Sequence, residues 1–142
     1  MALDLGEKRI GVATSDVTRT IAKAYGVLSR KSRQEDFKRY ANIIVDQQVT
    51  LLVMGLPIPL SGVEEQRAAW VRDYTAELAQ YIDIPIEFWD ESFSTKQAEA
   101  SLHARGKWGK KVKERVDAVA AAFILQDYLD ALAEAANLSG KL

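Results

Sequence analysis

The chain has 142 residues, of which 48% are hydrophobic and 27% are charged, a composition typical of one folded domain and not of a disordered or fibrous chain. The absence of cysteine and the single histidine, His103, exclude disulfides, thiolate zinc sites and metal sites built from several imidazoles. With 19 Lys and Arg against 20 Asp and Glu, only a local basic patch can favour a nucleic-acid partner.

No stretch is long and apolar enough to cross a membrane, and Asp4 lies where a signal peptide needs an apolar run. We therefore expect a cytoplasmic protein that makes no membrane contact and forms one domain over residues 1–142.

The first part of the chain predicts three strands and a helix. Residues 3–5 and 10–15 alternate in polarity on either side of a glycine-containing turn, as in a β-hairpin, and a third strand is expected over 22–28. Residues 32–47 carry apolar residues at helical spacing, with Ser32 as the expected N-cap.

The rest of the chain alternates strands and helices. A strand buried on both faces is expected over 49–54, a helix over 63–81 begins with a capping box of Ser61 and Glu64, and an alternating strand follows over 84–89. Ser94 and Gln97 predict the beginning of another helix, and a last helix is expected over 112–136. The order is that of an α/β fold.

Acidic residues lie at positions where an α/β sheet places its ligands. Asp4 lies in the first strand, which we expect to be central, although its carboxylate could also serve the turn by accepting from the amides of Gly6 or Glu7. Asp90 and Glu91 lie at the carboxyl end of the last strand and point to opposite faces, so one of them faces the site.

Two more acids lie on the apolar side of the last helix. Asp117 stacks under Ala120 and Ile124, so its carboxylate points at the sheet and needs a cation, either a basic side chain or a metal. Asp127 competes for this role, but it lies about 15 Å further along the helix, so the two cannot serve one site.

Carboxylates from a first strand, a strand end and a facing helix suit a hard divalent cation. Oxygen ligands favour Mg²⁺ or Mn²⁺, and two such ions can activate water and stabilise the leaving oxygen of a phosphodiester.

One segment is strongly basic despite the balanced total. Residues 103–115 predict a loop that holds phosphates and stacks a base, although a solvated surface loop is the alternative. The residues expected to bind substrate there are Lys107, Trp108, Lys110, Lys111 and Lys113.

Four segments in order resemble the YqgF (RuvX) family over nearly the whole chain. They are Asp4–Ala13 with Ser15-Asp16, Gly55-Leu-Pro57 with Gly62, Trp89-Asp-Glu91 with Thr95 and Ala98, and Lys110-Lys111 with Val116-Asp117 and 120–128.

The resemblance implies a single-domain, ribonuclease-H-like fold of the RuvC type, with a five-stranded mixed sheet and helices on both faces. It also implies that Asp4, Glu91 and Asp117 are the catalytic and metal-binding acids, rather than Asp90 or Asp127. We further expect Arg9, which lies in the first of these segments, to bind substrate.

The chain departs from the family pattern in two places. Ser92-Phe-Ser-Thr95 replaces the usual Arg-Leu-Thr-Thr, so a basic side chain beside the acids is missing, and the family usually has several more residues before the aspartate.

The resemblance implies a nuclease that matures the 5′ end of 16S rRNA from its precursor. The alternative is a resolvase of DNA four-way junctions, which would act as a homodimer. The small basic patch favours the RNA substrate. Two other functions stay open: a noncatalytic RNA-binding or ribosome-assembly module, and a sugar-kinase-like phosphate hairpin, for which the chain lacks the second domain.

Overall fold

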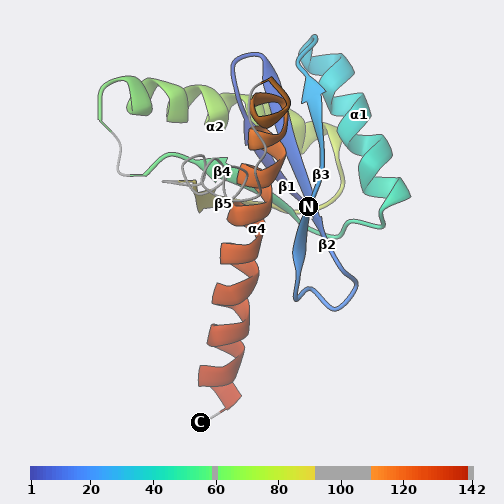
Figure 1. Ribbon diagram of the computed structural model, residues 1–142, viewed down its shortest axis with the longest axis vertical. Coiled ribbons are helices and arrows are strands. Elements are labelled where there is room, and N and C mark those ends of the chain that lie inside the picture. Colours follow the sequence, from blue (N-terminus) through green and yellow to red (C-terminus); the bar gives the residue numbers. More distant parts are fainter. Residues whose placement is uncertain (59–60, 92–109, 141–142) are drawn as a thin grey trace.

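A five-stranded sheet in the order β3-β2-β1-β4-β5 forms the centre of the computed structural model, which describes residues 1–58, 61–91 and 110–140 (Figure 1). β1 pairs antiparallel with β2 and parallel with β4, so it is the central strand. The five strands are β1 (Ala2–Leu5), β2 (Arg9–Ser15), β3 (Ala22–Ser29), β4 (Leu52–Leu56) and β5 (Ile86–Asp90). The mixed sheet and the central position of the first strand are both confirmed.

Helices cover both faces of this sheet. α1 (Arg33–Asp46) and α2 (Val63–Tyr81) pack on one face, and α4 (Lys110–Gly140) crosses the other (Figure 1). None of the helices in the described ranges is both long and apolar enough to cross a membrane.

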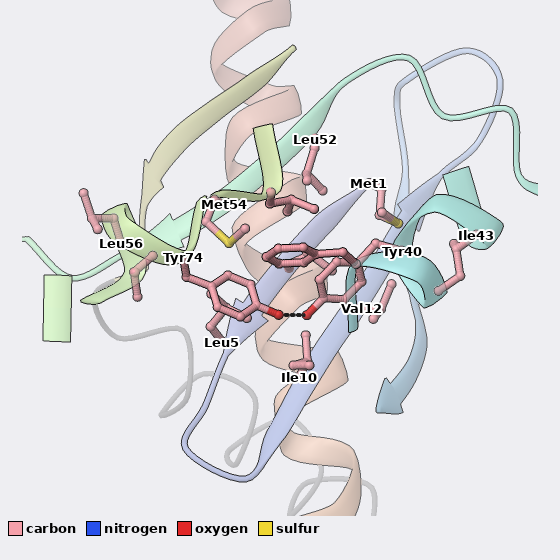
Figure 2. Packing of buried hydrophobic residues seen from close by; sticks show 14 of the residues in the cluster. Met1, Leu5, Ile10, Val12, Tyr40, Ile43, Leu52, Met54, Leu56 and Tyr74 are labelled. Atoms are coloured by element: carbon pink, nitrogen blue, oxygen red, sulfur yellow. Dashed lines mark hydrogen bonds between the residues drawn. The ribbon is translucent and has the colours of Figure 1, made fainter. Parts of the chain in front are cut away.

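The face under α1 and α2 holds the large side chains. Leu5, Ile10 and Val12 of the β1–β2 hairpin pack against Tyr40 of α1 and Tyr74 of α2, whose hydroxyls hydrogen-bond to each other at 2.8 Å (Figure 2). This pairing satisfies two hydroxyls that burial would otherwise leave without water.

The face under α4 is built from smaller residues. Ala2, Ala13 and Val53 of the sheet meet Ala121 and Ile124 of the helix. Because side chains alternate along a strand, Leu3 and Leu5 point toward α1 and α2, and Asp4 points toward α4.

Several predicted boundaries need correction. The expected strand over 49–54 begins at Leu52, because pairing starts there with a hydrogen bond from the Leu52 N–H to the Pro85 carbonyl at 3.0 Å. The strand over 84–89 is Ile86–Asp90, and the last helix runs from Lys110 to Gly140 rather than over 112–136.

Of the two expected helix caps, one is confirmed and one is wrong. The Ser32 hydroxyl accepts from the Glu35 N–H at 3.2 Å, as expected for an N-cap. The capping box of Ser61 and Glu64 does not form, because Gly62 occupies the N-cap of α2 with φ 53° and makes no side-chain cap. The helix expected from Ser94 lies outside the described residues.

Candidate active site

Asp4 is buried on the central strand, at 7% exposure, and faces α4. Its residue lies opposite Gly11 in the antiparallel register of β1 and β2. The Gly6 N–H, which a turn carboxylate would bind, donates instead to the Arg9 carbonyl at 2.8 Å. The alternative role of Asp4 in this turn is therefore not supported at Gly6.

Glu91 comes directly after β5 and is tied to the neighbouring strand by its backbone. Its N–H donates to the Leu56 carbonyl at 3.0 Å, and its side chain is only 8% exposed. The carboxylate fits because residue 55 is glycine: a Cβ at Gly55 would lie 2.9 Å from Glu91 Oε2. The adjacent Asp90 is exposed, which confirms the expectation that these two neighbouring acids point in opposite directions.

Asp4 and Glu91 form one buried acidic pair. Burial raises the pKa of Asp4 well above its usual range, and the charge of Glu91 together with a hydrogen bond between the two carboxyls raises it further. The positive charge of Arg67 acts in the opposite direction and lowers the pKa of Asp4, though by less than burial and Glu91 raise it. The two acids lie within hydrogen-bonding reach of each other at the end of the sheet.

Asp117 is brought to the same face by the close approach of α4 to β2. A Cβ at Gly11 would lie 1.8 Å from the Asp117 carbonyl oxygen, so only glycine permits this packing. The charge of Asp117 also raises the pKa of Asp4, though less than Glu91 does.

The cation that Asp117 needs is a basic side chain. Arg9 Nε donates to Asp117 Oδ2 at 3.0 Å, and the two side chains are 43% and 24% exposed. Arg9 was expected among the substrate-binding residues, and its exposed guanidinium lies at the edge of the acidic site.

Arg67 of α2 is a site residue that the sequence analysis missed. Its guanidinium lies 3.3 Å from Glu91 Oε1 and 3.9 Å from Asp4 Oδ1, so it supplies the basic group beside the acids that Ser92 was expected to leave missing. A signal for it exists in the sequence: Arg67 stands on the same helical stripe as the buried Val71, Tyr74 and Leu78.

The acids can be tested for their fit to a divalent cation. The described ranges contain no group of three or more His, Cys, Asp or Glu side chains placed to hold one ion, and Asp117 is paired with Arg9. Asp4 and Glu91 do fit as two of the ligands, since both offer hard oxygens and the buried Glu91 Oε1 has no hydrogen-bond partner in the described part of the chain.

The other predicted residues lie apart from this pair or outside the described residues. Asp127 accepts from Trp89 Nε1 at 2.7 Å, so it fastens α4 to β5. Lys107 and Trp108 lie outside the described residues. Lys110, Lys111 and Lys113 form the first turn of α4, where only the backbone is described.

Solved structures of RuvC and of a viral resolvase have a similar fold. The RuvC structure of Thermus thermophilus superposes with a TM-score of 0.56 at 16% identity over 93% of this chain and 94% of that one. A Fowlpox virus resolvase in complex with Holliday junction DNA superposes with a TM-score of 0.54 at 10% identity, over 92% of this chain and 95% of that one. These likenesses establish the RuvC-type, ribonuclease-H-like fold.

Similarity in sequence is much stronger. A protein of Roseiflexus sp. is 43% identical over 92% of both chains, and one of Syntrophomonas wolfei is 38% identical over the same share of both; each bears the name "Putative pre-16S rRNA nuclease". A family profile described as RuvX, Holliday junction resolvase, matches residues 1–131. With nearly its whole length matched by that profile and by these relatives, the chain belongs to the RuvX family.

Proposed function

We propose that this protein is a divalent-metal-dependent nuclease that hydrolyses phosphodiester bonds, with Asp4, Glu91 and Asp117 as its catalytic and metal-binding acids. The observation that carries the proposal is the buried pair of Asp4 and Glu91 at the carboxyl ends of parallel strands, where open α/β sheets bind ligands. A bound Mg²⁺ or Mn²⁺ would activate water and stabilise the leaving oxygen.

The residues of the chain have separate tasks in this proposal. Asp4 and Glu91 present oxygens that are held in place by the sheet, and Asp117 adds a carboxylate from α4. Arg9 contacts a substrate phosphate with the exposed part of its guanidinium. Further phosphate and base contacts are expected from Lys107, Trp108, Lys110, Lys111 and Lys113.

A noncatalytic module is disfavoured by the state of the acids. A carboxylate kept only for structure is stabilised by donors that saturate it, as buried polar groups usually are. Glu91 Oε1 is instead buried without a hydrogen-bond donor among the described residues, and burial and the charge of Glu91 raise the pKa of Asp4. The pair is costly to the fold, which is typical of a functional site.

For the substrate, we propose a 16S rRNA precursor, since the relatives that match nearly the whole chain are named "Putative pre-16S rRNA nuclease", and we expect cleavage at its 5′ end. Ribosomal RNA is made in the cytoplasm, where we place this protein. The second candidate is a DNA four-way junction, which the family description names. Symmetric cleavage of a junction would require a homodimer.

The test presents a 16S precursor end and a four-way junction to the same preparation, with Mg²⁺ and Mn²⁺ supplied separately and EDTA as the metal-free condition. We expect cleavage of the RNA with a metal and none in EDTA. Glu91→Gln should abolish cleavage, whereas Asp90→Asn, which changes the neighbouring exposed acid, should leave it near the wild-type rate. Full activity in EDTA would contradict the metal mechanism, and paired nicks in the junction with intact RNA would reverse the order of substrates.

A further inference from the structure

Arg67 reaches the acidic pair from the opposite face of the sheet. It belongs to α2, which packs with α1, yet its guanidinium lies within 3.9 Å of both Asp4 and Glu91 on the α4 side. Its side chain is 46% exposed, whereas those of Asp4 and Glu91 are 9% and 8% exposed.

Arg67 makes a hydrogen bond to the backbone and ion pairs to the acids. Its Nη2 donates a hydrogen bond to the Leu5 carbonyl at 3.0 Å, which anchors the guanidinium to the end of β1. The same atom lies 3.3 Å from Glu91 Oε1, but that oxygen receives no hydrogen bond within the described residues. Arg67 therefore supplies charge to the acids, and its directional bond goes to the backbone.

A cation held in this way balances the acids without saturating their oxygens. Glu91 Oε1 keeps its lone pairs, so a metal ion can take that oxygen while the arginine stays on Leu5. The positive charge nevertheless opposes a second cation at the same place, because like charges a few ångströms apart repel even in water-like screening.

We propose that Arg67 is an internal counter-cation, which stabilises the Asp4 and Glu91 pair in the ion-free protein and competes with a divalent cation for it. This inference rests on the ion site of the proposed function. It assigns Arg67 a role in setting the affinity for the ion and makes it a positioning residue rather than a catalytic one.

The experiment measures Mn²⁺ affinity by the electron paramagnetic resonance signal of the free ion, at pH 8, without substrate. Arg67→Gln should bind Mn²⁺ more tightly than the wild type, on the order of five- to thirtyfold, the effect of repulsion between one unit charge and a divalent ion about 4 to 8 Å apart in water-like screening. A merely structural role predicts the opposite, because a loosened pair binds an ion more weakly.

The matched control is Arg72→Gln, which removes the same charge from an exposed position of the same helix. Its Mn²⁺ affinity should equal that of the wild type, and an increase as large as that of Arg67→Gln would overturn the proposal by making the effect one of net charge. An unchanged or weaker affinity in Arg67→Gln would also overturn it.

Two further outcomes separate this inference from the proposed function. If neither the wild type nor Arg67→Gln binds Mn²⁺, the ion site itself fails; if only Arg67→Gln binds, the competition is supported. Should Arg67→Gln unfold in EDTA, recovery of its helical circular dichroism on adding Mn²⁺ supports the proposal, and failure to recover overturns it.

Discussion

Two buried carboxylates, one on each side of the sheet, are treated in opposite ways. Asp36, on the side of α1 and α2, accepts from the Lys31 N–H at 3.0 Å and from the Tyr74 hydroxyl at 3.2 Å, and it pairs with Arg39. Asp4, on the side of α4, lies beside the carboxyl of Glu91, which raises its pKa, and its ion-pair partner Arg67 is 3.9 Å away. The fold can satisfy a buried carboxylate, so the buried Glu91 Oε1, which has no hydrogen-bond partner in the ranges that the structure describes, supports our proposal that the face under α4 binds the ligand.

The two faces of the sheet also differ in the size of their buried side chains. Leucine, isoleucine and tyrosine fill the face under α1 and α2, where a large buried area stabilises the fold. Glycine and alanine line the face under α4, and their small size brings the backbone of that helix against the strands. The face under α1 and α2 contributes most of the buried apolar area, and the face under α4 allows the helix that carries Asp117 to lie close to the strands.

The largest effect is expected from filling the space that brings α4 to the sheet. Gly11→Ala places a Cβ 1.8 Å from the Asp117 carbonyl oxygen, and because the contact is with backbone, the helix must move. We expect the free energy of unfolding to fall by about 3 kcal/mol, at the upper end of overpacking costs.

Gly26→Ala is the control for this change, since a Cβ at Gly26 in β3 meets nothing within 4 Å. It should alter stability by less than about 0.5 kcal/mol. Urea denaturation of both variants measures the difference, and equal effects would refute the close approach of α4 at Gly11.

A smaller loss is expected from Asp36→Ala on the other face. The substitution leaves the buried Tyr74 hydroxyl and the Lys31 N–H without their acceptor, which costs about 2 kcal/mol. Arg39 adds less, because its side chain is partly exposed and can turn to water. Thermal unfolding checks this, and a variant as stable as the wild type would mean that Asp36 is not the structural acid described above.

Removing the carboxylate at Asp4 should raise the stability of the fold instead of lowering it. In EDTA, Asp4→Asn removes a carboxyl whose folded-state pKa is raised by burial and by Glu91. Such a group contributes stability below its ordinary pKa of 3.8, and this contribution is lost as the pH rises through the raised value.

The melting temperature of Asp4→Asn should therefore exceed that of the wild type increasingly as the pH is raised from 4 toward 8. At a pH above the raised pKa, the free energy of unfolding should be higher in the variant by about 1.4 kcal/mol for each unit by which folding raises the pKa of Asp4. Cleavage should be abolished in the same variant, and a difference in melting temperature that is independent of pH would contradict the raised pKa.

The smallest effect is expected at Trp89, which fastens the far part of α4. Trp89→Phe keeps a ring to pack against Tyr128 but loses the hydrogen bond to Asp127. Because this bond is exposed, its loss should cost about 1 kcal/mol or less. Urea denaturation measures this cost. A loss of stability larger than that of Asp36→Ala would contradict the view that the face under α1 and α2 contributes more to stability than the face under α4.

Much of the fold could be predicted because the local patterns agree with the tertiary structure. The hairpin, the buried strand and the helices follow from alternation and helical spacing. Asp4 is a candidate because it lies in the central first strand, and Glu91 is chosen over Asp90 at the end of the last strand by the family resemblance. Strand boundaries failed where pairing partners decide them: the strand over 52–56 begins where Pro85 and Met1 offer acceptors, which its own residues cannot indicate.

The parts of the site that were missed depend on distances between elements. Gly11 belongs to a motif that the sequence shows, but the motif does not indicate that this glycine lets the backbone of a helix more than a hundred residues later pack against the strand. Arg67 belongs to a helix of the other face, and only the three-dimensional path around the end of β1 brings it to the acids. Spacing along one element contains no information about such approaches.

The central position of β1 has a consequence for the motions of the site. Strands that are paired on both sides open only when the whole domain unfolds, so the amides of β1 should be among the last to exchange with deuterium. Glu91 follows the edge strand, and Asp117 lies near the beginning of α4, where local opening needs less energy. Asp4 is thus the most rigidly held residue of the proposed site, and any adjustment of that site during a turnover would fall on Glu91 and Asp117.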